Sequence, residues 1–309
     1  MSIPFDTQHD VPAGRLDPIA PGLQRLQGDN PGPFTFTGTG VFILGQGQTV
    51  AVIDPGPDSP GHRAALTRAL AGRRVSHILI THHHIDHTAC VDWLAAEHGA
   101  LTCGFGRPVR MADEDCGSRM EAGDDCGFCP ERLLEDGDVI EVGGLRIEAL
   151  HTPGHASNHM CFAATFAEIG EALFCGDHVM AWSTSVVTPP DGHMGDYIAQ
   201  LIRIRDRDFD VLFPTHGAAL YRPRAFLDAY IAHRRMREQG VLDCLADGVE
   251  NITDMVARLY PDLDRRLLPA ASLSLLAHLI TLREEGRVTG DGEDGLACRY
   301  RLREARAAE

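Results

Sequence analysis

Several features that are common in proteins are missing from this chain of 309 residues, and each absence narrows its class. No run of 18 apolar residues occurs, so we expect no membrane-spanning helix. The first residues, MSIPFDTQHD, lack a basic segment followed by an apolar one, so we expect no secretory signal. The nine cysteines are an odd number scattered along a long chain, which favours reduced thiols in a cytoplasmic setting over a disulfide framework.

Lysine is also absent, so all 28 basic residues are arginines, against 44 acidic residues. We interpret the missing lysine as a bias of genomic base composition rather than as a functional feature. Residues 1–221 carry nearly all of the net negative charge, whereas residues 222–309 are close to neutral and rich in arginine. A strongly acidic body repels polyanions at long range, unless bound cations or a local patch offset its charge.

The apolar runs predict strands that alternate with helices, with hairpins interspersed. Residues 40–45 and 49–54 form one predicted hairpin, and residues 139–142 and 145–150 form a second. Residues 1–33 are expected to form a loop or to lead into an edge strand. Further strands are predicted at 75–80, 100–103, 160–166, 172–174 and 211–213, and helices at 62–70, 88–98 and 197–206. This mixture excludes a purely parallel α/β sheet.

From residue 222 onward the predicted structure becomes helical. Residues 225–245 form one long amphipathic helix, two shorter helices follow at 253–259 and 271–285, and GDGEDG (290–295) separates two short strands. Three helices followed by a two-stranded ribbon are typical of a winged helix-turn-helix. We therefore predict two domains, residues 1–221 and residues 222–309.

The segment THHHIDHTAC (81–90) is the main candidate for a functional site. It follows a predicted buried strand and precedes a helix, which is where open sheets place their ligands. Because alternate residues of an extended segment share a face, His82 and His84 can bind one metal ion together. Asp86 and His87 lie where the chain turns into the helix and can bind a second ion. Imidazole and carboxylate are common ligands of divalent metal ions.

The H-x-H-x-D-H pattern after a strand resembles the hallmark of the metallo-β-lactamase superfamily, and three further segments occur in the family's order. They are HTPGHASNH (151–159), FCGDH (174–178) and FPTHG (213–217), which carry His155, Asp177 and His216. In addition, Asp54 in VIDPG resembles the early acid that braces the metal loop from behind.

The resemblance implies a fold, a metal centre and a reaction. The fold is of the α+β class, an αββα sandwich with the metal ions at one edge between its sheets, followed by the winged-helix domain. The first ion is bound by His82, His84 and His155. The second is bound by Asp86, His87 and His216, with Asp177 shared between both ions. The implied enzyme is a binuclear metal-dependent hydrolase in which a hydroxide bridges the ions and Asp86 also orients that nucleophile. Zinc is the default ion for such a site, with iron, manganese or nickel as alternatives.

Three functions remain open from the sequence. An aspartate at the bridging position, here Asp177, resembles the pattern of the thioester-hydrolysing and RNA-processing branches of the superfamily. The tail resembles the winged-helix extension of the β-lactamase-like protein 2 family, which includes endoribonucleases that act on single-stranded RNA. The first hypothesis is therefore RNA cleavage, and the second is a glyoxalase II-like thioesterase acting on a small anionic thioester. The third is a nucleic-acid-binding or dimerising tail with secondary catalysis, which leaves a homodimer open. Tail arginines could hold phosphates or form ordinary salt bridges; these are Arg234, Arg235, Arg237, Arg265 and Arg266.

Other polar residues near these segments have weaker assignments. His159 is expected to donate to a developing oxyanion or, alternatively, to support a metal ligand from behind. His83 is expected to point away from the first ion, and His178 is a candidate for lining the cleft. The stretch 103–137 is enlarged relative to the family. Within it, the polar, glycine-rich insertion at 115–131 is expected to form a lid over the site or, alternatively, to hold a structural zinc ion; the cysteines considered for that ion are Cys103, Cys116, Cys126 and Cys129.

Overall fold

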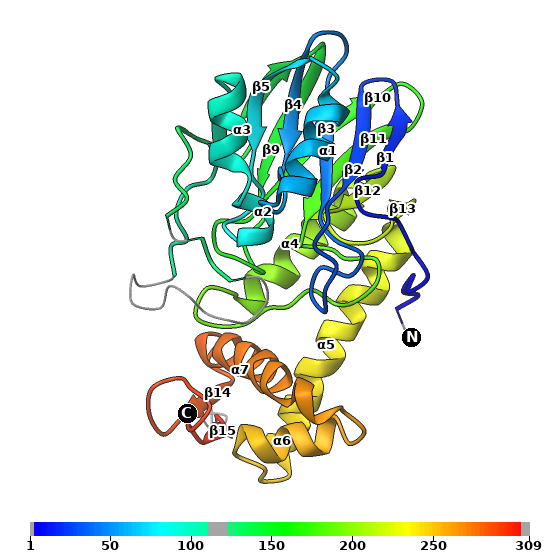
Figure 1. The fold of residues 1–309 in the computed structure, drawn as a ribbon. Coiled ribbons are helices and arrows are strands. Elements are labelled where there is room, and N and C mark those ends of the chain that lie inside the picture. Colours follow the sequence, from blue (N-terminus) through cyan, green and yellow to red (C-terminus); the bar gives the residue numbers. More distant parts are fainter. Residues whose placement is uncertain (1–2, 111–122, 126, 304–309) are drawn as a thin grey trace.

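The computed structural model describes residues 3–110, 123–125 and 127–303. Two β-sheets pack face to face in the larger part of the molecule, with helices on both outer sides, and a smaller helical part lies below them (Figure 1). This is the four-layer αββα arrangement that the family resemblance implied, followed by a smaller C-terminal part.

The first sheet has seven strands whose spatial order follows the sequence. They are β1 (Leu16–Ala20), β2 (Leu23–Gln27), β3 (Gly40–Leu44), β4 (Thr49–Ile53), β5 (Arg74–Leu79), β6 (Leu101–Gly104) and β7 (Arg132–Leu133). β1 and β2 pair as an antiparallel hairpin, so the N-terminal region that we expected to be a loop or an edge-strand lead-in forms two strands. β4, β5 and β6 run parallel to one another.

The second sheet has six strands in the order β13-β12-β11-β10-β9-β8. They are β8 (Val139–Val142), β9 (Leu145–His151), β10 (Met160–Phe166), β11 (Gly170–Gly176), β12 (Val211–Pro214) and β13 (Leu220–Tyr221). β8 and β9 form the predicted hairpin across Gly143 and Gly144. β11 and β12 are the parallel pair of this sheet.

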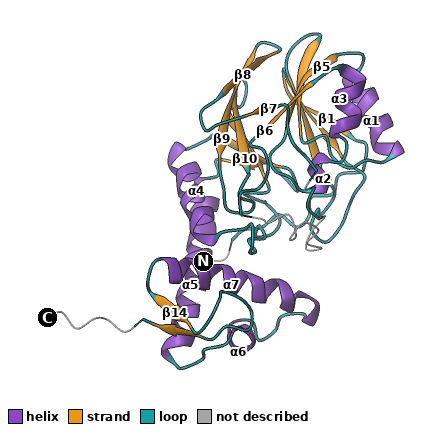
Figure 2. Ribbon diagram, turned by 90° about the vertical axis from the view of Figure 1, so that its left-hand side faces the viewer, coloured by secondary structure: helices purple, strands orange, loops and turns teal. Residues whose placement is uncertain are grey.

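Helices cover the outer faces of both sheets. α1 (Pro60–Leu70) and α3 (Val91–His98) lie on the first sheet, and α4 (Met194–Arg207) lies on the second (Figure 2). The short α2 (Ile85–Thr88) lies within the histidine-rich segment of residues 81–90 and contains Asp86 and His87. Across the described part of the chain, no helix has both the length and the apolar character needed to cross a membrane.

The described residues of the smaller part form three α-helices, one short 3-10 helix and a two-stranded ribbon. They are α5 (Arg224–Ala246), α6 (Ile252–Leu259), the short 3-10 helix η2 (Arg265–Leu267), α7 (Leu268–Glu284), β14 (Val288–Gly290) and β15 (Tyr300–Leu302). The ribbon pairs antiparallel, as expected for a wing.

The main core lies between the two sheets and is rich in phenylalanine. In β3, Phe42 and Leu44 face the opposite sheet while Val41 and Ile43 face the helices, as the two-residue period of a strand requires. Phe42 packs edge-on against Phe174 of β11 with ring centroids 5.0 Å apart. Burial of each such side chain contributes about 1.5–3 kcal/mol to folding, so this core fixes the spacing of the sheets whose edges carry the candidate site.

Helix α5 joins the two parts of the molecule. Its first half buries Phe226 and Tyr230 in the core on the outer face of the second sheet. Its last turns bury Val241 and Cys244 in the core of the smaller part. A single continuous helix therefore contributes to both cores, and the division near residue 222 stays a prediction.

His278 of α7 gives the smaller part a predicted sensitivity to acid. The side chain is buried, and desolvation together with nearby Arg234 lowers the pKa of His278 to about 3. In an unfolded chain the pKa of histidine is about 6.5, so between these values the unfolded state binds more protons. We expect the free energy of unfolding to fall as the pH falls below about 6.5, with His278 contributing about 2 kcal/mol of this loss by pH 5.

Urea unfolding of the wild type and of His278→Leu at several pH values measures this contribution. The wild type should lose stability relative to His278→Leu as the pH falls, because the variant has no histidine to protonate at this position. Leu273→Ala, a non-titrating change in the same helix, is the control and should shift stability equally at every pH. Parallel wild-type and His278→Leu profiles would show that the residue carries no acid sensitivity.

Candidate metal centre

The seven predicted metal ligands come from four segments that meet at one edge of the sandwich. His82, His84, Asp86 and His87 follow β5, and the others follow β9, β11 and β12; these are His155, Asp177 and His216. Because β5 belongs to one sheet and β11 and β12 to the other, the two sheets together position the cluster. All seven side chains are buried.

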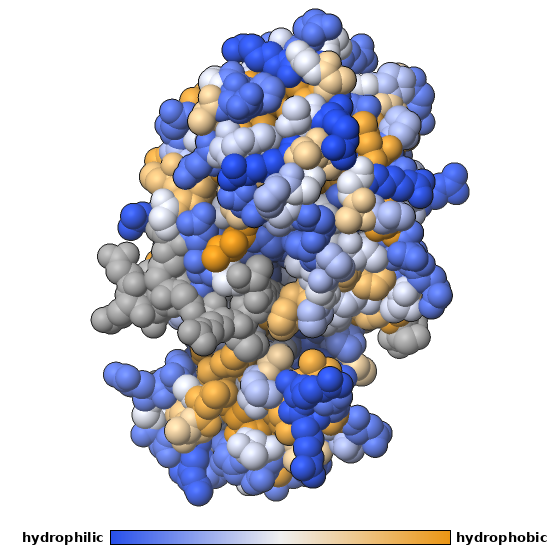
Figure 3. All heavy atoms as spheres, viewed as in Figure 1, coloured by the Kyte–Doolittle hydropathy of each residue, from blue (hydrophilic) through white to orange (hydrophobic). Residues whose placement is uncertain are grey.

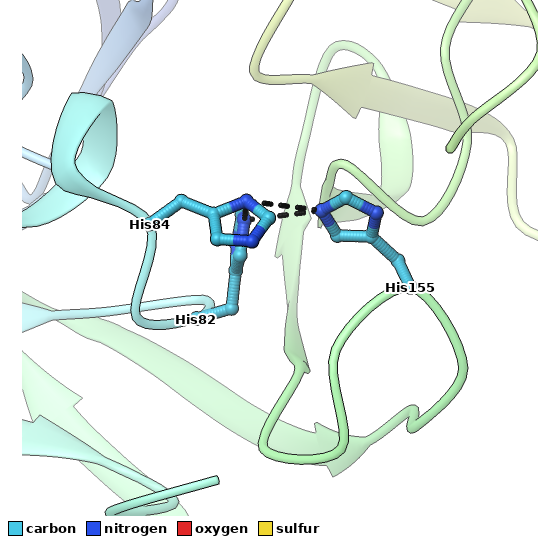
Figure 4. Close-up of side chains that lie close together, drawn as sticks. All are labelled: His82, His84 and His155. Carbon is cyan, nitrogen blue, oxygen red and sulfur yellow. Dashed lines mark hydrogen bonds between the residues drawn. The ribbon is translucent and has the colours of Figure 1, made fainter. Parts of the chain in front are cut away.

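The first group contains three histidines that point toward one another (Figure 4). His82 Nε2 lies 2.8 Å from His84 Nδ1, and His155 Nε2 lies 3.3 Å from each of these nitrogens. Three imidazole nitrogens thus converge from loops that are 71 to 73 residues apart in the chain.

The second group contains two histidines and two carboxylates. Asp86 Oδ2 lies 3.1 Å from His216 Nε2 and 3.5 Å from His87 Nε2. Asp177 Oδ2 lies 3.4 Å and 3.6 Å from the same two nitrogens. Potential ligand atoms of His82, His87 and Asp177 also lie within 4.8 Å of one another, so Asp177 adjoins both groups.

Each of the five histidines uses its second ring nitrogen to contact a group outside the cluster. His155 Nδ1 donates to the Val186 carbonyl at 2.6 Å, and His216 Nδ1 donates to the Gly38 carbonyl at 3.3 Å. His84 Nε2 lies 3.5 Å from a carboxylate oxygen of Asp124. A carbonyl or a carboxylate can only accept, so these partners place the proton on the outer nitrogen and leave a lone pair on the inner one.

Asp54 organises the remaining two histidines from behind. Its Oδ2 accepts from His87 Nδ1 at 2.8 Å and from Thr81 Oγ1 at 2.8 Å. Because the Thr81 hydroxyl donates its proton to Asp54, it accepts from His82 Nδ1, which lies 3.0 Å away. The buried Asp54 carboxylate therefore fixes the tautomers of His82 and His87, one from each group.

The pKa values reflect the concentrated negative charge of the second group. Burial alone would lower the pKa of His87, but Asp86, Asp54 and Asp177 raise it well above its usual value. Burial likewise opposes protonation of His216, yet the carboxylates of Asp177 and Asp86 raise the pKa of His216 to about 10. These carboxylates therefore attract positive charge into the cluster.

The first group has the opposite character. Burial, together with repulsion from His87 and His84, lowers the pKa of His82 well below its usual value. Burial and the neighbouring His155 do the same to the pKa of His84. These imidazoles therefore stay neutral, which is the form that can bind a metal ion.

The donor set fits two divalent cations. Lone pairs on imidazole nitrogens that converge at 2.8–3.3 Å repel one another unless a cation or a proton lies between them. Within the described residues, His87 Nε2 and Asp177 Oδ1 are buried without a hydrogen-bond partner, and both belong to the cluster. A first ion would be held by His82, His84 and His155, and a second by Asp86, His87 and His216, with Asp177 beside both.

His159 lies behind the cluster rather than in an open cleft. The side chain is fully buried, its Nδ1 lies 2.9 Å from Thr152 Oγ1, and its Nε2 accepts from the backbone N–H of Asp177 at 3.3 Å. Burial and repulsion from His178 lower the pKa of His159 well below its usual value, so the ring is neutral. This placement favours the supporting role; donation to an oxyanion stays a prediction that none of these contacts supports.

The other two histidines also contact groups away from the cluster. His83 points away from the first group, toward Asn158 at 3.0 Å and Asp124 at 3.1 Å. His178 is buried against Tyr197, with ring centroids 4.7 Å apart, and so packs into the protein rather than lining an open cleft.

Sequence reasoning missed Asp124, a carboxylate that contacts both His83 and His84. It lies in a polar, glycine-rich stretch where no spacing pattern distinguishes one acid from the next. Cys116 and Cys126, two of the cysteines considered for a structural zinc site, lie outside the described residues. Cys129 is described and exposed, and the proposed zinc site stays a prediction.

Comparison with known proteins matches both parts of the chain. Residues 35–216 match the metallo-beta-lactamase superfamily, and residues 252–295 match the beta-lactamase associated winged helix domain. The chain is 32% identical over 260 residues to the atrochrysone carboxyl ACP thioesterase AgnL7 of Paecilomyces divaricatus, covering 82% of this chain and 74% of the relative.

Two further relatives support the same assignment. The atrochrysone carboxyl ACP thioesterase dmxR1 of Cryptosporiopsis sp. (strain 8999) is 30% identical over 238 residues. This match covers 76% of the chain but 66% of the relative, so the chain spans just under two thirds of that protein. A solved structure, a metallo-beta-lactamase family protein from Thermus thermophilus, is 26% identical with a TM-score of 0.68, covering 91% of this chain and 99% of that one.

Proposed function

The chain belongs to the metallo-beta-lactamase superfamily and carries a beta-lactamase associated winged helix domain, and on this premise we propose that it is a binuclear metal-dependent hydrolase of thioesters. The observation that carries the proposal is the convergence of five imidazole nitrogens and two carboxylates in one buried cluster. Two divalent ions, with zinc as the default, would supply a Lewis acid for the thioester carbonyl and would lower the pKa of the attacking water.

The protein's own groups keep this site in order. Asp54, Asp124 and the carbonyls of Val186 and Gly38 hold the histidine rings in one tautomer and one orientation. The carboxylates of Asp86 and Asp177 attract cations, and Asp86 can accept a proton from water that enters the cluster. The net reaction consumes one water and releases a carboxylic acid and a thiol.

The names of the relatives favour a thioester over RNA. Both AgnL7 and dmxR1 are named as thioesterases of an acyl carrier protein, whereas these names give no support to endoribonuclease activity. The charge of the chain points the same way, because its formal net charge of −16 repels a polyanion. Several exposed tail arginines are also paired with acids, among them Arg258 with Asp247 and Arg266 with Asp264.

An activity panel tests the proposal. Metal-loaded protein is offered a glutathione thioester, a carrier-protein thioester, a lactone, a cephalosporin and a single-stranded RNA. We expect a thioester to be turned over with a kcat/KM at least about tenfold above that of any other substrate, since the substrate pocket contributes discrimination of this order. The turnover should disappear on chelation and return when metal is restored.

An Asp86→Ala variant shows whether the measured turnover belongs to this site, because it removes one carboxylate of the cluster. Asp92→Ala, an exposed change on the following helix, is the matched control and should retain activity. RNA cleavage that Asp86→Ala loses, without any thioester turnover, would establish the endoribonuclease alternative instead.

A further inference from the structure

A cavity of about 550 Å³ lies where the larger and smaller parts of the molecule meet. Its wall on the larger side is the loop of residues 182–188, together with Phe34. On the smaller side it is bounded by α5, by η2 and by the start of α7. Hydrophobic residues gather on the side of the smaller part that faces the larger one (Figure 3). The volume is in the range of pockets that bind small molecules.

Most of the cavity lining is apolar, and one wall is formed by a planar aromatic side chain. Trp182 stacks on Phe36 with ring centroids 4.9 Å apart and planes 8° apart, and so presents a rigid aromatic wall. Tyr260, Leu263 and Leu267 contribute from the opposite side. Such a surface suits a planar or bulky apolar group. The entropy cost of binding is small, because the rigid aromatic walls need not be ordered when the group binds.

Two arginines of α5 bring positive charge into this apolar cavity. Arg234, which is only 4% exposed, donates to the Ser185 carbonyl at 2.5 Å and lies over the ring of Tyr197. Arg237 donates to the Leu259 carbonyl at 3.2 Å and lies 4.3 Å from the ring centre of Tyr260. Both guanidinium groups are thus held in fixed positions by carbonyls and rings.

Among the residues that the structure describes, no carboxylate balances these charges. The described lining of the cavity contains no aspartate or glutamate, and within the same residues neither arginine forms an ion pair. The Nε atoms of Arg234 and Arg237 are buried and lack a hydrogen-bond partner in the described part of the chain, as does the indole nitrogen of Trp182. A buried donor without an acceptor, or a buried charge without a counter-ion, destabilises the folded protein. An anion that bound here would accept from the free donors and balance the charge, and would therefore be stabilised.

One residue of the cavity wall also contacts the candidate metal centre. Val186 lines the cavity, and its carbonyl accepts the hydrogen bond that orients His155. The loop of residues 182–188 therefore borders both the cavity and the candidate metal centre.

We infer that this cavity binds the acyl part of the substrate, and that this acyl part combines an apolar, ring-like body with an anionic oxygen group such as a carboxylate that pairs with Arg234 and Arg237. That the ligand is a substrate rests on the proposed function. That the cavity binds such a ligand does not depend on it. It assigns the cavity to the acid side of the thioester rather than to the phosphate of its carrier, because the walls are apolar and aromatic.

Calorimetric titration of the metal-loaded full chain tests this inference. The probes are 2-naphthoate, its neutral counterpart 2-naphthamide, and coenzyme A. We expect naphthoate to bind at least about tenfold more tightly than the amide, since one charge-assisted hydrogen bond is worth about that factor. In Arg237→Gln this preference should fall clearly below that of the wild type, because only Arg234 remains to pair with the carboxylate. Arg235→Gln, which removes the same charge from an exposed neighbour on the same helix, should retain it.

Several results would overturn the inference. They are equal affinity for the acid and the amide, an equal loss in Arg235→Gln, or an Arg237-dependent site that binds coenzyme A but not naphthoate. If Arg237→Gln does not fold, Arg237→Lys retains the charge and should keep a preference for the acid. Repeating the titration after chelation excludes binding of naphthoate to the metal ions themselves.

The outcome is separable from that of the proposed function. Naphthoate binding with the expected variant pattern, in a protein that hydrolyses no thioester, would leave the cavity assigned and the proposed reaction wrong. Thioester hydrolysis without any preference for the acid probe would support the proposed function and show that the assignment of the cavity is wrong.

Discussion

An Asp177→Asn variant is expected to lose about 10³-fold in kcat/KM for the thioester and to bind about one metal ion per chain instead of two. Asp177 Oδ2 lies 3.4 Å from His216 Nε2 and 3.6 Å from His87 Nε2, and the residue also adjoins His82 of the first group. Asparagine keeps the shape but removes the charge, and its amide cannot attract a cation as a carboxylate does. Metal analysis of the purified protein and steady-state kinetics measure the two effects.

The matched control is Asp206→Asn, which removes an exposed carboxylate at the end of α4, where it pairs with Arg205. It should retain metal content and activity. If Asp177 is a direct ligand as proposed, excess metal should not restore the kcat of Asp177→Asn. Full activity in this variant would mean that Asp177 is not a ligand, and the proposed binuclear centre would have to be abandoned.

The sequence indicated the candidate site because its chemistry is concentrated in short segments. His82, His84, Asp86 and His87 fall within six positions, so the two-residue period of an extended segment is enough to group them. His155, Asp177 and His216 are far away in sequence, and only their resemblance to family motifs connected them to the cluster. No local pattern could have done so, because the two sheets bring them together through contacts between distant strands.

Most of the groups that accept hydrogen bonds from the outer nitrogens of the histidines could not be predicted from the sequence. The carbonyls of Val186 and Gly38 belong to the backbone, which every residue possesses, so no residue type marks them. Asp124 could not be distinguished by sequence from the other acidic residues of the same stretch. Asp54 was the exception, since it stands at the end of a predicted strand within a recognisable motif.

The N-terminal hairpin was missed because its residues conceal the strand period. Pro18 and Gly22 interrupt the region, and β2 buries Arg25 and Gln27 among apolar neighbours. Arg25 donates to the carbonyl of Gly217 at 2.7 Å, so a charged residue faces inward where the pattern predicts an apolar one. A sequence pattern records polarity but cannot show that a distant carbonyl will satisfy it.

From the sequence, the tail arginines could hold phosphates or form ordinary salt bridges, and the structure supports the second role for only some of them. Arg266 pairs with Asp264 on the surface, as an ordinary salt bridge. Arg234 and Arg237 instead face an apolar cavity without a carboxylate partner among the described residues. Residue type alone could not separate these cases, because the difference depends on which face of α5 meets the larger part of the molecule.

An Asp54→Asn variant is expected to weaken metal binding about 10–100-fold while leaving the ligands themselves in place. The Asp54 carboxylate accepts from Thr81 N, Thr81 Oγ1 and His87 Nδ1 at 2.8 Å each. An amide in its place must turn a donor toward at least one of these donors, so one contact becomes repulsive whichever way the amide faces. Asparagine tolerates the positive φ of 47° at this position, so the change acts on the hydrogen bonds rather than on the backbone.

The metal dependence of activity distinguishes this positioning role from a general loss of stability. In Asp54→Asn the histidines remain, so excess zinc should restore most of kcat, whereas Asp177→Asn should stay inactive at any metal concentration. Thr215→Val removes a weaker donor to the same carboxylate, at 3.2 Å, and should shift the metal affinity less. If Asp54→Asn bound metal as tightly as the wild type, the proton on His87 would not depend on Asp54. In that case the order of the cluster would have to come from packing alone, since the hydrogen bonds to Asp54 would contribute nothing to holding a cation.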